Sequence, residues 1–217
     1  MTSLGSNFYL DRNLIFFDIP MNDTSLTSNW YPQHNNTEVS IMESIQRNIF
    51  NSSVNMCSNG VICGLIENGK YEVITDINWS NAMSSSIKLD ILSSLKDLQY
   101  LRTLDLSSNK ITGNLIDFSK FPSLISLKLA NNSLDHEGFD SSLFPTNIQI
   151  LNLGSNLLNG NIHDVRFTSK DLKVLNISDN LFTNISATSF NSLSNTNGSI
   201  ILIQSIFNKE KKRTGLL

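Results

Sequence analysis

Apolar residues recur at fixed positions in four successive segments of the chain, 101–111, 124–134, 148–158 and 172–182. Each segment begins with an apolar residue and has two more at its fourth and sixth positions, an Asn at the ninth and another apolar residue at the eleventh. In the first segment these positions hold Leu101, Leu104, Leu106, Asn109 and Ile111. The segments start 23, 24 and 24 residues apart, so the chain contains an internal repeat.

The spacing inside one segment predicts a short strand followed by a turn. Leu104 and Leu106 are two positions apart, which is the period that places both side chains on one face of a strand. Burying four such apolar side chains contributes about 1.5–3 kcal/mol each. Ordering the backbone costs about 1–2 kcal/mol for each of about 24 residues. One segment cannot fold alone, so the segments must stack and share a core.

This residue order and spacing define a leucine-rich repeat, whose period is about 20–29 residues. The predicted fold class is α/β: a leucine-rich-repeat solenoid with a curved parallel β-sheet on its concave face, short helices or turns on its convex face, and a small helical N-terminal cap. An Asn side chain offers two N–H donors and one acceptor to the backbone groups that stacking buries. We therefore predict a structural Asn ladder made of Asn109, Asn132, Asn156 and Asn180.

The region before the repeats predicts a cap. A helix is expected from residue 38 to 49, because Ile41, Ile45 and Ile49 fall on one helical face. A strand over 73–80 carries a first, degenerate repeat. The predicted organisation is an unassigned N-terminal extension (1–37), a cap with a cysteine pair (38–72), about five leucine-rich repeats (73–190), and a degenerate last repeat with a basic tail (191–217).

The two cysteines of the chain, Cys57 and Cys63, have two interpretations. In an oxidising compartment they can form a disulfide, and in the cytosol they would remain reduced thiols. Two cysteines without a nearby His fall short of the four ligands of a structural zinc site, so no metal is predicted.

Several motifs resemble the extracellular leucine-rich-repeat domains of plant receptor-like kinases and receptor-like proteins. The cap has a short helix at 38–49, a Gly60-Val61-Ile62-Cys63 motif and a strand that starts at Val73. The repeat continues as Asn-x-Ile-x-Gly-x-Leu over 109–115 and as Asn-x-Leu-x-Gly-x-Ile over 156–162. The cap lacks the family's Trp between its cysteines, and no repeat has the family's Pro after the Gly. The resemblance covers about residues 38–190.

The resemblance implies a receptor-like recognition module outside the cell or at its surface, with a cap disulfide and with a protein or peptide ligand or a co-receptor as partner. The alternative is a cytoplasmic leucine-rich-repeat scaffold with reduced cysteines. The apolar run at 14–17 is too short for a secretory signal. Because no apolar run reaches 18 residues, we expect no membrane span in this chain.

Charge and motif content argue against other classes of function. The net charge of −3 does not favour a nucleic-acid surface. His34, His136 and His163 are isolated in sequence, and neither a Gly-x-Ser-x-Gly nor a phosphate-binding loop occurs. We predict a non-catalytic protein without a cofactor.

Strand residues between the inward leucines should face the concave side of the solenoid. Small, hydrogen-bonding side chains dominate there, which suits an extended peptide or a protein partner, although a merely solvated strand surface would look the same. The candidate ligand-binding residues are Asp76, Thr103, Asp105, Ser107, Ser126, Lys128 and Asn152.

Two further patterns complete the predictions. Asn-x-Ser/Thr sequons make glycosylation candidates of Asn22, Asn35, Asn51, Asn78, Asn131, Asn176, Asn184 and Asn197. That number exceeds only slightly what the Asn, Ser and Thr content would give. A stacked aromatic row on the wide side of the coil is expected from Phe118, Phe121, Phe139, Phe144, Phe167 and Phe190.

Overall fold

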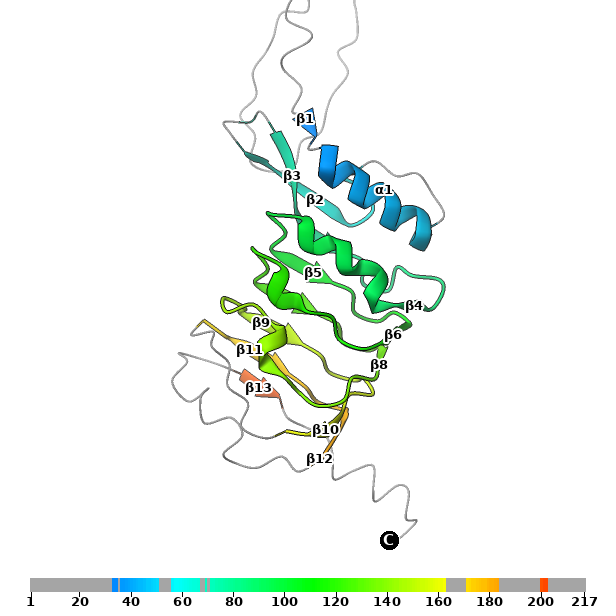
Figure 1. Cartoon of the computed structure of the whole chain (residues 1–217), viewed down its shortest axis with the longest axis vertical. Coiled ribbons are helices and arrows are strands. Elements are labelled where there is room, and N and C mark those ends of the chain that lie inside the picture. The colour runs from blue at the N-terminus through cyan, green and yellow to red at the C-terminus, as the bar shows by residue number, and fades with distance from the viewer. Residues whose placement is uncertain are drawn as a thin grey trace, which may run out of the picture. The chain divides into compact units, whose positions relative to one another are not determined.

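The computed structural model (Figure 1) describes residues 33–34, 36–50, 56–66, 69, 71–162, 171–183 and 200–202. Its main sheet has eight strands. Seven of them are parallel and follow one another in the order β1 (Gln33–His34), β3 (Tyr71–Asn78), β5 (Thr103–Asp105), β7 (Ser126–Lys128), β9 (Ile150–Asn152), β11 (Val174–Asn176) and β13 (Ile200–Leu202). The eighth, β2 (Val61–Ile66), pairs antiparallel with β3. The predicted parallel sheet of stacked repeats is confirmed.

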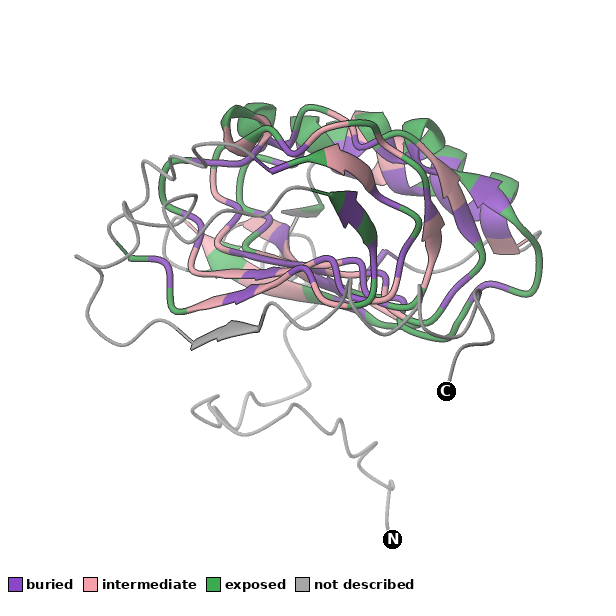
Figure 2. Cartoon of the chain, turned by 90° about the horizontal axis from the view of Figure 1, so that it is seen from below, coloured by how far each residue is buried: buried purple, intermediate pink, exposed green. Residues whose placement is uncertain are grey.

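A second set of short strands and helices closes each coil. Two smaller parallel sheets are formed by β4 (Ile87–Lys88), β6 (Ile111–Gly113) and β8 (Ser133–Leu134), and by β10 (Asn159–Asn161) and β12 (Leu181–Thr183). The 3-10 helices are η1 (Leu89–Asp97), η2 (Phe118–Lys120) and η3 (Ser141–Leu143). Figure 2 shows these helices on the side of the coil opposite the main sheet, with buried positions between the two layers.

The core consists of the repeat leucines and an aromatic row. Leu104, Leu127, Leu151 and Leu175 are paired in register along the sheet, and none is more than 1% exposed. On the helical side, the ring centroids of Phe118 and Phe121 lie 5.3 Å apart, those of Phe118 and Phe144 lie 6.2 Å apart, and those of Phe139 and Phe144 lie 5.9 Å apart. These four residues therefore form the expected row, whereas Phe167 and Phe190 lie outside the described residues.

The Asn side chains link one coil to the next. Asn156 Nδ2 donates to the carbonyls of Leu129, at 3.0 Å, and Leu153, at 3.0 Å, while its Oδ1 accepts from the Leu134 N–H at 3.1 Å. Asn109, Asn132 and Asn180 make equivalent contacts with their own neighbours. Each of these Asn side chains thus joins two stacked turns through buried or part-buried backbone groups.

The cap contains the predicted helix and one strand that the sequence did not indicate. Helix α1 (Asn36–Phe50) buries Met42, Ile45 and Ile49 against the first coil. A disulfide joins Cys57 to Cys63. We did not predict β2, whose six residues Val-Ile-Cys-Gly-Leu-Ile follow the turn after Cys57 and pair with β3 from Tyr71 to Ile77.

Candidate recognition surface

The outward side chains of the main sheet form two aligned columns. Strand register places the first column in the order Asp76, Thr103, Ser126, Ile150 and Val174. It places the second column in the order Asn78, Asp105, Lys128, Asn152 and Asn176. Neighbouring rows of a sheet are about 4.8 Å apart, so the columns are continuous tracks across the strands. We call these ten residues the strand face.

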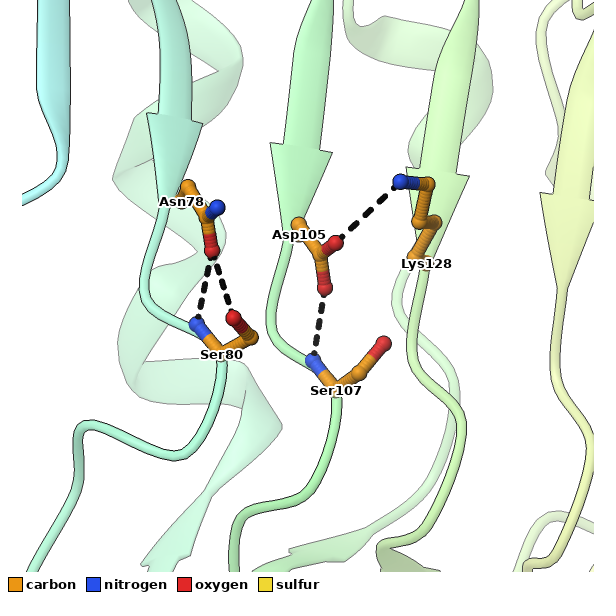
Figure 3. Close-up of polar contacts among 5 residues, drawn as sticks. All are labelled: Asn78, Ser80, Asp105, Ser107 and Lys128. Carbon is orange, nitrogen blue, oxygen red and sulfur yellow. Dashed lines mark hydrogen bonds and ion pairs between the residues drawn. The ribbon is translucent and has the colours of Figure 1, made fainter.

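Four of the five residues of the second column close the turn that follows their strand. Asn78 Oδ1 accepts from the Ser80 N–H at 3.1 Å, and Asp105 Oδ1 accepts from the Ser107 N–H at 3.0 Å (Figure 3). Asn152 and Asn176 accept in the same way from the residues two positions on, at 3.2 and 3.0 Å. These are Asx turns, in which a side chain mimics a backbone carbonyl. One oxygen of each side chain is therefore engaged in structure.

Lys128 interrupts this column and carries its only positive charge. Its Nζ lies 3.3 Å from Asp105 Oδ2, with the Lys128 side chain 39% exposed and that of Asp105 14% exposed (Figure 3). An ion pair of this exposure is worth about 0–1 kcal/mol. Asp105 thus uses one carboxylate oxygen for the turn and the other for Lys128, whereas Lys128 keeps donors directed to solvent.

The first column changes from polar to aliphatic along the sheet. Within the described residues, the Asp76 carboxylate has no ion-pair or hydrogen-bond partner and is partly exposed. Thr103 is half-buried and Ser126 is only 7% exposed, so Ser126 offers a partner little surface. Ile150 and Val174 follow and are half-buried. Ser107, another candidate, lies two residues beyond β5's end and contributes its N–H to the Asx turn of Asp105.

Three sequons lie in the described part of the chain, and they differ in access. Asn78 and Asn131 are exposed, whereas Asn176 is half-buried. A methyl group added at Gly154 would lie 2.7 Å from Asn176 Nδ2, so the amide of Asn176 rests on this glycine. The remaining sequons lie outside the described residues and are Asn22, Asn35, Asn51, Asn184 and Asn197.

Among the described residues, two carboxyl groups have displaced pKa values. Burial raises the pKa of Glu38, which is 1% exposed in the cap, and a hydrogen bond from the Ile74 N–H at 2.8 Å offsets part of that rise. Hydrogen bonds from the Ser142 side chain and N–H lower the pKa of Asp140, which caps η3.

One cluster in the described residues has metal-ligand side chains, made of His34, Cys57 and Glu72. The Cys57 sulfur belongs to the disulfide, and only a thiolate is an effective sulfur ligand. His34 Nδ1 lies 3.0 Å from Glu72 Oε2, so their contact with each other explains why these two side chains lie close together. Among the described helices, none has the length and apolar content needed to cross a membrane.

No family model matches the sequence. The chain is 38% identical over 96 residues to Receptor like protein 22 of Arabidopsis thaliana, a match that spans 41% of this chain and 12% of that protein.

Solved structures with the same fold include several receptor domains. The leucine-rich-repeat ectodomain of the receptor kinase SOBIR1 from Arabidopsis thaliana matches with a TM-score of 0.65 and 22% identity, covering 81% of this chain and 95% of that one. The PEPR1–AtPEP1 structure matches with a TM-score of 0.61 and 19% identity, and the match covers 78% of this chain and 24% of that one. A third match is the Arabidopsis receptor kinase HAESA, solved in complex with the peptide hormone IDA and the co-receptor SERK1. Its TM-score is 0.56 at 20% identity, and the match covers 78% of this chain and 33% of that one. The chain therefore has the leucine-rich-repeat fold of plant receptor ectodomains, and its sequence resembles that of a receptor-like protein.

Proposed function

We propose that this chain is a non-catalytic recognition module, a receptor-like leucine-rich-repeat ectodomain or a segment of one, which binds a protein or peptide across its strand face. The observation that carries the proposal is the pair of aligned columns on a sheet held by the Asn ladder. Asp76, Thr103 and Lys128 direct polar groups from this sheet that no turn requires. A rigid array of this kind binds a partner without first ordering its own backbone.

The similar structures support the same class of partner. HAESA was solved with a peptide hormone and a co-receptor, and the receptor PEPR1 was solved with AtPEP1. By analogy we propose an extended peptide as the ligand and a second receptor chain as an additional partner.

We further propose an extracellular or cell-surface location for the module. The Cys57–Cys63 disulfide supports this location, because structural disulfides persist in oxidising compartments and are rare in the cytosol. An intracellular scaffold is the alternative, and it requires both cysteines to be reduced. Intact mass before and after reduction of the protein purified from its native compartment separates the two.

The test of the strand face uses variants that leave the Asx turns intact. The strand-face triple is Asp76→Arg, Thr103→Arg and Lys128→Glu. A matched control with the same charge changes, Asp135→Arg, Asn114→Arg and Lys120→Glu, alters exposed residues of the loops and of η2. Peptides selected from a displayed random library against the wild-type chain serve as probes.

The expected result is that the strand-face triple weakens most selected peptides about tenfold or more, which corresponds to about 1.4 kcal/mol or more. The control triple should bind them as the wild type does. If the control weakens binding while the strand-face triple binds normally, recognition takes place on another surface.

A further inference from the structure

A hollow of about 410 Å³ opens at the N-terminal ends of the main-sheet strands, away from the Asx turns. One wall comes from β2 and β3, through Leu65, Val73 and Thr75. The other wall comes from the segments that lead into β5, β7 and β9, and includes Tyr100, Arg102 and Asn147. Sites for small ligands and single side chains commonly have volumes of about 300–1,000 Å³, so the hollow is large enough to hold part of a partner.

Its apolar lining is incompletely covered. Six large apolar side chains in the described part of the chain are markedly exposed, and two of them, Leu65 at 44% and Tyr100 at 42%, line this hollow. Val73, also in the lining, is buried at 1% exposed. Adjacent exposed apolar groups in a concave site mark a place where a ligand can bury apolar surface.

The polar lining combines two hydroxyls that already donate to backbone carbonyls with a guanidinium and an amide. Thr75 Oγ1 donates to the Ile62 carbonyl at 3.3 Å, and Ser123 Oγ donates to the Gln99 carbonyl at 2.6 Å, so both hydroxyl protons are already used. Among the described residues, the Arg102 guanidinium has no acidic partner and none of the lining side chains is a carboxylate. The amide of Asn147 adds further N–H donors.

We propose that this hollow binds a peptide element in which an apolar side chain lies beside a carboxylate. The apolar side chain would contact Leu65 and Tyr100, and the carboxylate would accept from the Arg102 guanidinium, whose planar N–H groups match the two carboxylate oxygens. A neutral carbonyl accepts a weaker hydrogen bond from Arg102 than a carboxylate does, and a cationic group is repelled, which makes the site selective for the acid. The carboxylate can belong to the last residue of a chain or to an internal acidic side chain, and both present the same chemistry.

The experiment follows backbone amide signals by NMR during titration with four small probes. N-acetyl-leucine and its amide represent a chain end with and without the carboxylate. N-acetyl-Leu-Glu-amide and N-acetyl-Leu-Gln-amide represent an internal acid and its neutral match. We expect shifts at 64–66, 73–75 and 100–102, and about tenfold tighter binding of at least one acid than of its neutral match. The pair with the larger ratio identifies the source of the carboxylate.

Two exposed cations provide the variants, and both are changed to Gln. Arg102→Gln should abolish the preference for the acid, whereas Lys110→Gln, on an exposed turn outside the hollow, should keep it. Tyr100→Ala should weaken the acid and the amide equally, because it removes apolar contact alone. Equal melting temperatures of the four proteins exclude unfolding as the cause.

The proposal is overturned if all probes bind equally, if Arg102→Gln keeps the preference, or if no probe shifts the hollow's signals at its solubility limit. None of these results bears on the strand face, whose test uses different residues.

Discussion

Replacing Asn156 by Ala removes the side chain that joins the repeat at 148–158 to the repeat at 124–134. Asn156 is 3% exposed, so water cannot substitute for its amide without local opening. Its Nδ2 donates to the carbonyls of Leu129, Leu153 and Gly154, and its Oδ1 accepts from the Leu134 N–H. The variant therefore loses three donated contacts and one accepted contact in a buried position.

The energetic cost of the substitution depends on which backbone partners of Asn156 keep another hydrogen bond. The Leu129 carbonyl still accepts from Asn132, and the Leu153 carbonyl still accepts from Asn180, so these acceptors remain satisfied. The Leu134 N–H loses its acceptor, and an orphaned buried N–H costs about 1–3 kcal/mol. The two amide N–H groups of Asn156 also lose a net value of about 0.5–1.5 kcal/mol each, which brings the expected destabilisation to about 2–6 kcal/mol.

Urea unfolding followed by circular dichroism measures this difference as a shift of the midpoint multiplied by the slope. Asn114→Ala is the matched control, since Asn114 is exposed and does not belong to the ladder. We expect the control to unfold within about 0.5 kcal/mol of the wild type. Similar midpoints for the two variants would show that the Leu134 N–H finds another acceptor and would refute the assignment of a structural role to this amide.

Three other perturbations have expected outcomes. The pKa of Glu38 is raised in the folded chain, so folding holds this proton more tightly. Stability should therefore fall as the pH rises from the ordinary value of 4.5 through the raised pKa, and Glu38→Gln should lack this part of the decrease. Gln46 is 1% exposed and neither polar atom of its side chain has a hydrogen-bond partner among the described residues. Gln46→Met should therefore raise the free energy of unfolding in urea by about 1–2 kcal/mol, and a lower value would contradict it. Gly60 and Gly113 both have positive φ, at 84° and 88°, but a Cβ at Gly60 would lie 2.0 Å from a backbone oxygen whereas one at Gly113 meets nothing within 4 Å. Gly60→Ala should therefore lower the melting temperature well beyond the loss from Gly113→Ala, and equal losses would refute the contact.

The repeats and the ladder could be predicted because stacking fixes them position by position. An inward residue such as Leu127 must be apolar, and Asn156 must have both donors and an acceptor, so the sequence repeats wherever the backbone does. Strand β2 could not be found in this way. Its residues lack the alternation of a half-buried strand, and it is held by pairing with β3 across a turn. The hollow could not be predicted either, because Tyr100 and Arg102 occupy positions at which the repeat imposes no residue type.

The outward columns show how a repeat pattern can resemble a binding surface. Asp105 and Asn152 are polar, aligned and accessible, which are the properties expected of ligand contacts. Both also accept from the N–H two residues on, and a turn that recurs in each coil selects Asp or Asn at that position without any ligand. A signal for this was present in the sequence, because each is followed two positions later by a small residue.

Turn closure therefore separates the strand face into residues that the fold requires and residues that it leaves open. No turn requires Asp76, Thr103 or Lys128, and the same is true of the aliphatic pair Ile150 and Val174 farther along the first column. A partner that lies across the strands would meet a carboxylate and a hydroxyl at β3 and β5 and aliphatic groups at β9 and β11. The rows from β3 to β9 are three steps apart, about 14 Å, which an extended peptide covers with about four residues. Under the proposed function, a basic residue about four positions from an aliphatic one is therefore the ligand pattern that this face favours.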